Sequence, residues 1–198
     1  MIESKETVYT DHDEVLIEDS GEDDAGPVVS NAFTPIDFDI SNRRIRDLHR
    51  DYKDQDLDPR PGFQRGYVWD KARASRLIES VLLHVPLPLI YTAEEVDGRE
   101  VVIDGQQRLT TFFSFIDGTF PKDGSIFKST SLKILTELNS KSFKTLPDPV
   151  RRDFLKYTLS IIKIGAKSHP DIRFEIFERL NTGSVSLSEQ ELRNCLHR

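Results

Sequence analysis

Five consecutive residues, Asp104-Gly105-Gln106-Gln107-Arg108, place an acid, two amides and a guanidinium around a glycine. Carboxylate oxygens suit Mg²⁺, and a guanidinium is a planar fork of donors that fits phosphate oxygens. If a helix begins directly after the glycine, its first backbone N–H groups and its dipole also favour an anion. The pattern predicts a phosphate-binding turn in which Asp104 binds Mg²⁺ or orients water; the alternative is that this carboxylate only stabilises the turn.

The residues on either side of this motif predict a strand, a glycine turn and a helix. Residues 101–103 are β-branched throughout, as in a buried strand. After the motif, apolar residues recur at the spacing of one helix face, at Leu109, Phe112, Phe113 and Ile116. A β-hairpin is the alternative, because Asp-Gly is a strong hairpin signal. The two adjacent phenylalanines would point to opposite faces of a strand, which favours the helix.

Charge divides the 198-residue chain into two parts. Residues 1–30 contain ten acids and one base, a net charge of −9, and the total of −7 therefore leaves +2 for residues 31–198. The first part is predicted to be an acidic disordered tail and the second a single domain. The single cysteine, Cys195, excludes an intrachain disulfide. No signal peptide and no apolar run of membrane-spanning length is present, so we expect a soluble, cytoplasmic protein with no membrane partner.

Periodicity and breaker residues predict the remaining elements. Strands are expected at 36–40, 87–91, 99–103 and 158–164, with the second and third forming a hairpin, and a short extended piece at 57–60. Helices are expected from a cap at Ser41 or Asn42 to about 52, from Asp70 through Val85, over 147–157, after Ser168, and from a capping box at 188–191. Residues 119–146 show weak periodicity and are interpreted as an insertion with short elements.

Two further polar clusters accompany the central motif. Gln64 and Arg65 precede Tyr67 and Trp69 in the loop before the helix that Asp70 caps. The simpler interpretation is that the aromatic residues pack on the core and the arginine is solvated or ion-paired. An Asn181-Thr182-Gly183 loop follows the helix after Ser168, and Asn181 alone could serve as a helix C-cap.

Taken in order, these three clusters resemble the N-terminal domain of GmrSD-type modification-dependent restriction proteins. They are FQR…YVWD at 63–70, IDGQQRLTT at 103–111, and FERLNTG at 177–183 with LSEQEL at 187–192. The resemblance runs from about residue 34 to the end, with the acidic tail and 119–146 outside it. It implies an α+β fold similar to ParB and sulfiredoxin, a small curved sheet with flanking helices. The chain ends in mid-helix, so its C-terminal helical extension is expected to be truncated.

The resemblance implies nucleotide binding and hydrolysis in anti-phage restriction, because ParB-like relatives hold nucleoside triphosphate phosphates with a Gly-x-x-Arg turn. Gly105-Gln106-Gln107-Arg108 matches that turn. By this hypothesis the amides after the glycine and Arg108 hold the phosphates, and Arg65, with Gln64 beside it, neutralises charge on the transferred group. Asp104 holds Mg²⁺, and Asn181 and Thr182 contact base or ribose.

Two other functions stay open. A non-catalytic module could read DNA bases or phosphates with the same amides and guanidinium. The net charge of +2 for residues 31–198 argues against strong nonspecific DNA affinity. A ParB-like nuclease is the third option, and the scarcity of clustered carboxylates and histidines counts against it. Members of the family usually carry a C-terminal HNH-type nuclease domain. That region is expected to be missing here, so contact with DNA is expected through a full-length protein or a partner nuclease.

Overall fold

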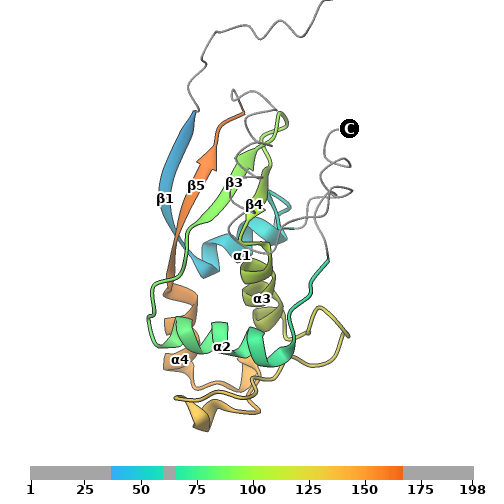
Figure 1. Ribbon diagram of the computed structural model, residues 1–198, viewed down its shortest axis with the longest axis vertical. Coiled ribbons are helices and arrows are strands. Elements are labelled where there is room, and N and C mark those ends of the chain that lie inside the picture. The colour runs from blue at the N-terminus through green and yellow to red at the C-terminus, as the bar shows by residue number, and fades with distance from the viewer. Residues whose placement is uncertain (1–36, 60–65, 167–198) are drawn as a thin grey trace, which may run out of the picture. The chain divides into compact units, whose positions relative to one another are not determined.

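A computed structural model of the chain describes residues 37–59 and 66–166. Within these two ranges the fold is α+β, as expected, with a five-stranded mixed sheet and four α-helices. The helices expected after residue 168 and from residue 188 lie outside the described residues. Figure 1 shows the central feature of this fold: β4 leads directly into α3.

The sheet has the strand order β1-β5-β3-β4-β2. Its strands are β1 (Phe38–Arg44), β2 (Leu57–Asp58), β3 (Ile90–Glu94), β4 (Glu100–Asp104) and β5 (Thr158–Ile164). β1 pairs antiparallel with β5, β5 parallel with β3, β3 antiparallel with β4, and β4 parallel with β2. The predicted hairpin of β3 and β4 and the predicted bounds of β5 are confirmed.

The boundary between β1 and α1 (Ile45–Lys53) differs from the sequence prediction. A helix cap at Ser41 or Asn42 is wrong, because both residues belong to β1 and pair with β5, Ser41 opposite Ile161. The antiparallel ladder keeps this stretch extended, and the Ile45 N–H donates to the Tyr157 carbonyl at 3.0 Å where the helix begins. The inward face of α1 was predicted correctly, since its Ile45 side chain is fully buried.

The region between α2 (Lys71–Leu82) and β3 also departs from the prediction. Val85 lies beyond the helix and is 44% exposed, because the chain leaves the helical conformation at His84, whose φ is 55°. β3 begins at Ile90 and not at residue 87. The carbonyls of Pro88 and Leu89 accept hydrogen bonds from the Arg108 side chain. The Arg108 side chain therefore holds residues 88 and 89 in place just before β3 begins to pair with its neighbours.

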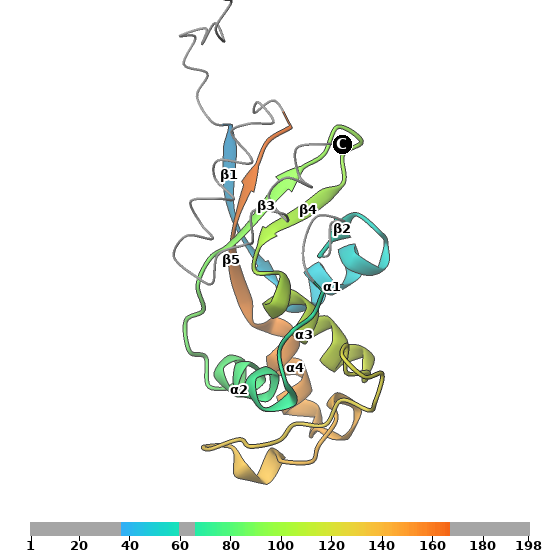
Figure 2. The ribbon, with the colours of Figure 1, turned by 45° about the vertical axis from the view of Figure 1, so that its right-hand side comes forward.

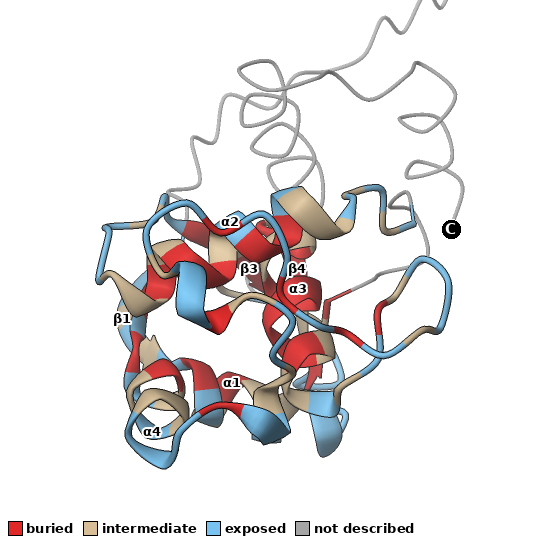
Figure 3. Cartoon of the chain, turned by 90° about the horizontal axis from the view of Figure 1, so that it is seen from below, coloured by how far each residue is buried: buried red, intermediate tan, exposed pale blue. Residues whose placement is uncertain are grey.

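An aromatic cluster fixes α3 (Gln106–Asp117) in the core. Phe115 contacts Phe127 and Phe154 edge-on, with ring centroids 5.2 and 5.7 Å apart, and Phe112 contacts Phe154 at 6.0 Å. Phe154 belongs to α4 (Asp148–Lys156). All four rings are fully buried, and Figure 3 shows the buried residues along the inner sides of the helices. This packing fixes the middle of α3 against α4 and Phe127.

Residues 119–146 contain short elements, as expected. They form two 3-10 turns, η1 (Thr136–Leu138) and η2 (Phe143–Thr145), and one bridge between Thr119 and Ile126. The buried Glu79 carboxylate of α2 accepts backbone N–H groups from Lys133, Ile134 and Leu135. One α2 side chain thus anchors this long connection to the core.

Candidate functional site

Gly105 forms the turn between β4 and α3 in a conformation that requires glycine. Its φ is 101° and its ψ is 4°, in the left-handed region. A Cβ atom at this position would lie 2.9 Å from Cγ1 of Ile90 and 3.3 Å from Nη2 of Arg108. Both the backbone conformation and the surrounding space therefore exclude a side chain here. The predicted strand, glycine turn and helix are confirmed, and the hairpin alternative is wrong.

The start of α3 directly follows this turn. Its N-cap residue is Gly105, which carries no side chain and contributes no capping hydrogen bond. The first intrahelical bond runs from the Leu109 N–H to the Gly105 carbonyl at 3.0 Å. The N–H groups of the first helical turn point away from the helix body, where an anion is favoured.

Arg108 lies beside the turn, and its guanidinium is engaged with protein acceptors. It donates to the carbonyls of Pro88 and Leu89, the latter at 2.9 Å, and to Oδ2 of Asp104 at 2.9 Å. Only 12% of its side chain is exposed. Burial lowers the pKa of Arg108, while the charge and hydrogen bond of Asp104 act in the opposite direction. The two carbonyl contacts could not be predicted, because sequence patterns do not reveal which backbone carbonyls will lack strand or helix partners.

Asp104 is the only member of the motif predicted to bind a metal ion, and its side chain is 40% exposed. One of its oxygens accepts from Arg108. Within residues 37–59 and 66–166, no three His, Cys, Asp or Glu side chains gather as a set of metal ligands. Mg²⁺ is often held by one or two carboxylates, with waters and substrate phosphates completing the octahedron. The donor set here fits a phosphate-bound Mg²⁺ rather than a permanent metal site.

Gln107 joins the second sequence cluster to the first. Its Oε1 accepts the Val68 N–H at 3.0 Å, and its Nε2 donates to the Gly66 carbonyl at 3.2 Å. Figure 2 shows this blue-green segment passing beside α3 on its way into α2. The structure therefore brings part of the 63–70 cluster to the turn. Gln64, Arg65, Asn181 and Thr182 lie outside the described residues, and their roles stay predictions.

The end of the same segment is also fixed. Asp70 caps α2 as predicted, since its Oδ1 accepts the Arg73 N–H at 2.7 Å. The Arg73 guanidinium lies over the Trp69 ring, 4.6 Å from its centroid. The residue before Trp69, Val68, is 46% exposed. The segment before α2 thus carries an exposed apolar side chain, Val68, and an aromatic ring, Trp69, that pairs with an arginine of α2.

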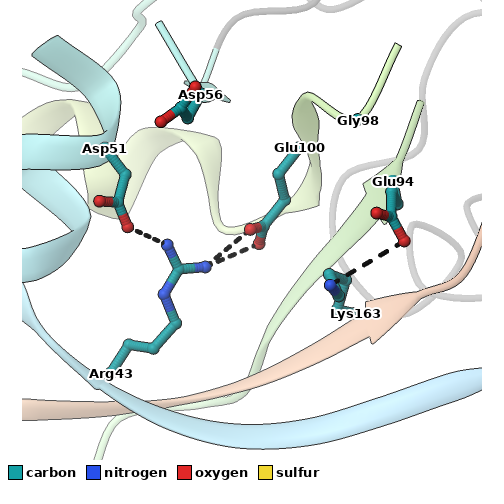
Figure 4. A pocket seen from close by; sticks show the side chains of 7 residues that line it. All are labelled: Arg43, Asp51, Asp56, Glu94, Gly98, Glu100 and Lys163. Atoms are coloured by element: carbon teal, nitrogen blue, oxygen red, sulfur yellow. Dashed lines mark hydrogen bonds and ion pairs between the residues drawn. The ribbon is translucent and has the colours of Figure 1, made fainter. Parts of the chain in front are cut away.

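A polar cavity of about 320 Å³ lies near the start of β4, at the opposite end of that strand from Gly105 (Figure 4). Its charged lining consists of Arg43, Asp51, Asp56, Glu94, Glu100 and Lys163. The Arg43 guanidinium pairs with both Asp51 of α1 and Glu100 of β4, the latter at 2.7 and 3.0 Å. Because the Arg43 guanidinium is paired with two of these carboxylates, its role is to connect β1, α1 and β4.

A comparison with known protein families finds one match, and its range includes the turn at Gly105. Residues 45–198 match the family described as the N-terminal domain of the GmrSD restriction endonuclease. The chain belongs to this family. No curated protein and no solved structure matches the chain. The GmrSD N-terminal domain is part of a restriction protein, and the matched range includes the turn, the segment before α2 and residues 119–146. Among the described helices none is long and apolar enough to cross a membrane.

Proposed function

We propose that this GmrSD N-terminal domain binds a nucleoside triphosphate at the start of α3 and hydrolyses it as part of an anti-phage restriction system that acts on DNA. The observation that carries the proposal is the left-handed Gly105 turn, which presents the first helical turn of α3 without an N-cap side chain. Backbone N–H groups and a helix dipole at such a turn favour phosphate. Membership of a restriction family provides the biological setting.

Arg108 supports the phosphates in this proposal mainly through its charge. Its Nη2 lies 3.3 Å from the position that a Cβ of Gly105 would occupy, so the guanidinium lies next to the turn, where it also pairs with Asp104. Its hydrogen bonds to Leu89 and Asp104 hold that charge in place. A fixed charge in a partly desolvated site acts on an anion more strongly than one in water.

Asp104 is the residue that would hold Mg²⁺ together with the phosphate oxygens. Its carboxylate is partly exposed and adjoins the glycine of the turn. When bound, the ion would neutralise charge on the phosphates. We keep Gln64 and Arg65 as proposed contacts to the transferred group, and Asn181 and Thr182 as proposed contacts to base or ribose.

The experiment that tests this function uses the full chain with each nucleoside triphosphate, with and without Mg²⁺ and DNA. Binding is measured by calorimetry and turnover by phosphate release, for wild type and Arg108→Ala. Mg²⁺-dependent binding and phosphate release that fall in the variant support the proposal. Tight DNA binding that no nucleotide alters would instead favour the non-catalytic DNA module.

A further inference from the structure

We infer that Gln107 is a positioning residue whose carboxamide holds the main chain of residues 66–68 against the start of α3. The sequence predicts Gln107 among the nucleotide-binding residues, and that role stays a prediction. Its side chain bonds at both ends of the amide to one segment of backbone. The inference concerns the same site as the proposed function and rests on it for its kinetic consequence, while the contact itself is independent of any ligand.

The Gln107 carboxamide bonds residues 66–68 in the way that a neighbouring β-strand would. Oε1 accepts the N–H of Val68 at 3.0 Å, and Nε2 donates to the carbonyl of Gly66 at 3.2 Å. A primary amide offers an acceptor and a donor side by side, as a peptide group of a neighbouring strand does. The carboxamide thus satisfies two backbone groups, one on each side of Tyr67.

A second contact fixes the same segment one helical turn further along α3. The Tyr67 hydroxyl lies 2.8 Å from Oγ1 of Thr111, and this oxygen in turn bonds the Gln107 carbonyl at 2.7 Å. Thr111 has one hydroxyl hydrogen, which it donates to that carbonyl, so Tyr67 is the donor to Thr111. Residues 107 and 111 are four apart and share one face of the helix. The contacts of Gln107 and Thr111 therefore hold residues 66–68 along one face of α3.

Packing does not hold this segment at Gly66. A Cβ atom added there would meet no atom of residues 37–59 or 66–166 within 4 Å. Val68 is 46% exposed, whereas the Tyr67 ring packs edge-on against Phe120 with centroids 5.7 Å apart. Gly66 and Val68 therefore depend on the Gln107 side chain, while the Tyr67 ring is fixed by the core.

Amide hydrogen exchange on the full chain tests the contact directly. In Gln107→Met, which keeps the side-chain length and removes both hydrogen bonds, we expect the Val68 amide to exchange roughly five- to tenfold faster. The Leu109 amide, which bonds within α3, should be unaffected. Gln107→Glu keeps an acceptor for Val68 and loses the donor to Gly66, so it should retain more Val68 protection than Gln107→Met. Lys128→Met, at an exposed position, is the matched control.

Ligand affinity separates positioning from direct contact. Inorganic triphosphate with Mg²⁺ is the probe, since it contains only the phosphate part of the proposed ligand. We expect Gln107→Met to bind it within about threefold of wild type and to lose phosphate release from the nucleotide, a fall in kcat without an equal rise in KM. Unchanged Val68 exchange, or a loss of triphosphate affinity as large as that of Gly105→Ala, would overturn the inference. If wild type binds no triphosphate, the proposed function fails while the exchange result still decides the contact.

Discussion

The Arg108 guanidinium donates to the backbone carbonyl of Leu89 at 2.9 Å, across the turn that joins β4 to α3. This contact links the residue that ends the family motif to the chain that leads into β3. The residues 104–108, which the sequence predicts as ligands, therefore also stabilise the surrounding backbone. Gln107 holds the segment before α2 on one side, and Arg108 holds the segment before β3 on the other.

Arg108 should contribute to stability as well as to function. Arg108→Ala removes the donors to Leu89, Pro88 and Asp104, and we expect it to lower the free energy of unfolding by about 2–3 kcal/mol. Arg108→Lys keeps the charge but cannot reach three acceptors with a planar fork, so an intermediate loss is expected. Urea unfolding followed by circular dichroism measures both. A stability equal to wild type in Arg108→Ala would show that these contacts are not formed in solution.

Gly105→Ala should be more costly than an ordinary glycine substitution. The left-handed φ and the 2.9 Å approach to Ile90 act together, and about 2 kcal/mol of destabilisation is expected. Gly98→Ala is the matched control, because its φ is also positive, at 85°, and a Cβ there would meet nothing within 4 Å. Thermal unfolding of the two variants separates crowding from backbone strain. Equal losses would mean that crowding against Ile90 contributes nothing.

Glu79 should make stability depend on acid pH. Burial by itself would raise the pKa of Glu79, but the three backbone donors of residues 133–135 outweigh it and lower the pKa below its ordinary value of 4.5. A group whose pKa is lowered on folding stabilises the protein above its unfolded pKa. That contribution is lost as the pH falls below about 4.5 and through the folded-state pKa.

The matching variant is Glu79→Gln, which leaves the N–H groups of residues 133–135 with a weaker acceptor. We expect a loss of about 2–3 kcal/mol at neutral pH and a smaller difference from wild type below pH 4.5. Unfolding titrations at neutral pH and at pH 4 and below measure this. A difference that stays constant with pH would show that folding does not lower the pKa of Glu79.

Local patterns were sufficient to predict some elements. β5 has the expected bounds and α3 begins after the glycine as expected, because β-branched composition and the helical spacing of Leu109, Phe112 and Phe113 are properties of each segment itself. The boundary between β1 and α1 was missed because it depends on pairing with β5, more than a hundred residues away. The residue preferences of a short segment carry no information about a strand so far away in the sequence.

In the candidate site, too, the local features could be predicted and the tertiary contacts could not. The turn at Gly105 could be predicted, because glycine followed by a helical pattern is a local signal. The partners of Gln107 and Arg108 could not, since Val68 and Leu89 approach α3 only through the tertiary fold. The side chains that seemed most available for a ligand are those that hold the surrounding backbone.

The proposed function depends above all on phosphate binding at the start of α3. Calorimetric titration of the full chain with Mg²⁺ and inorganic triphosphate, for wild type and for Gly105→Ala confirmed to be folded by circular dichroism, tests it most directly. We expect binding by wild type and at least roughly tenfold weaker binding by the variant, because the displaced turn misdirects the helix amides. Equal affinity in the two proteins, or no binding by wild type, would contradict it.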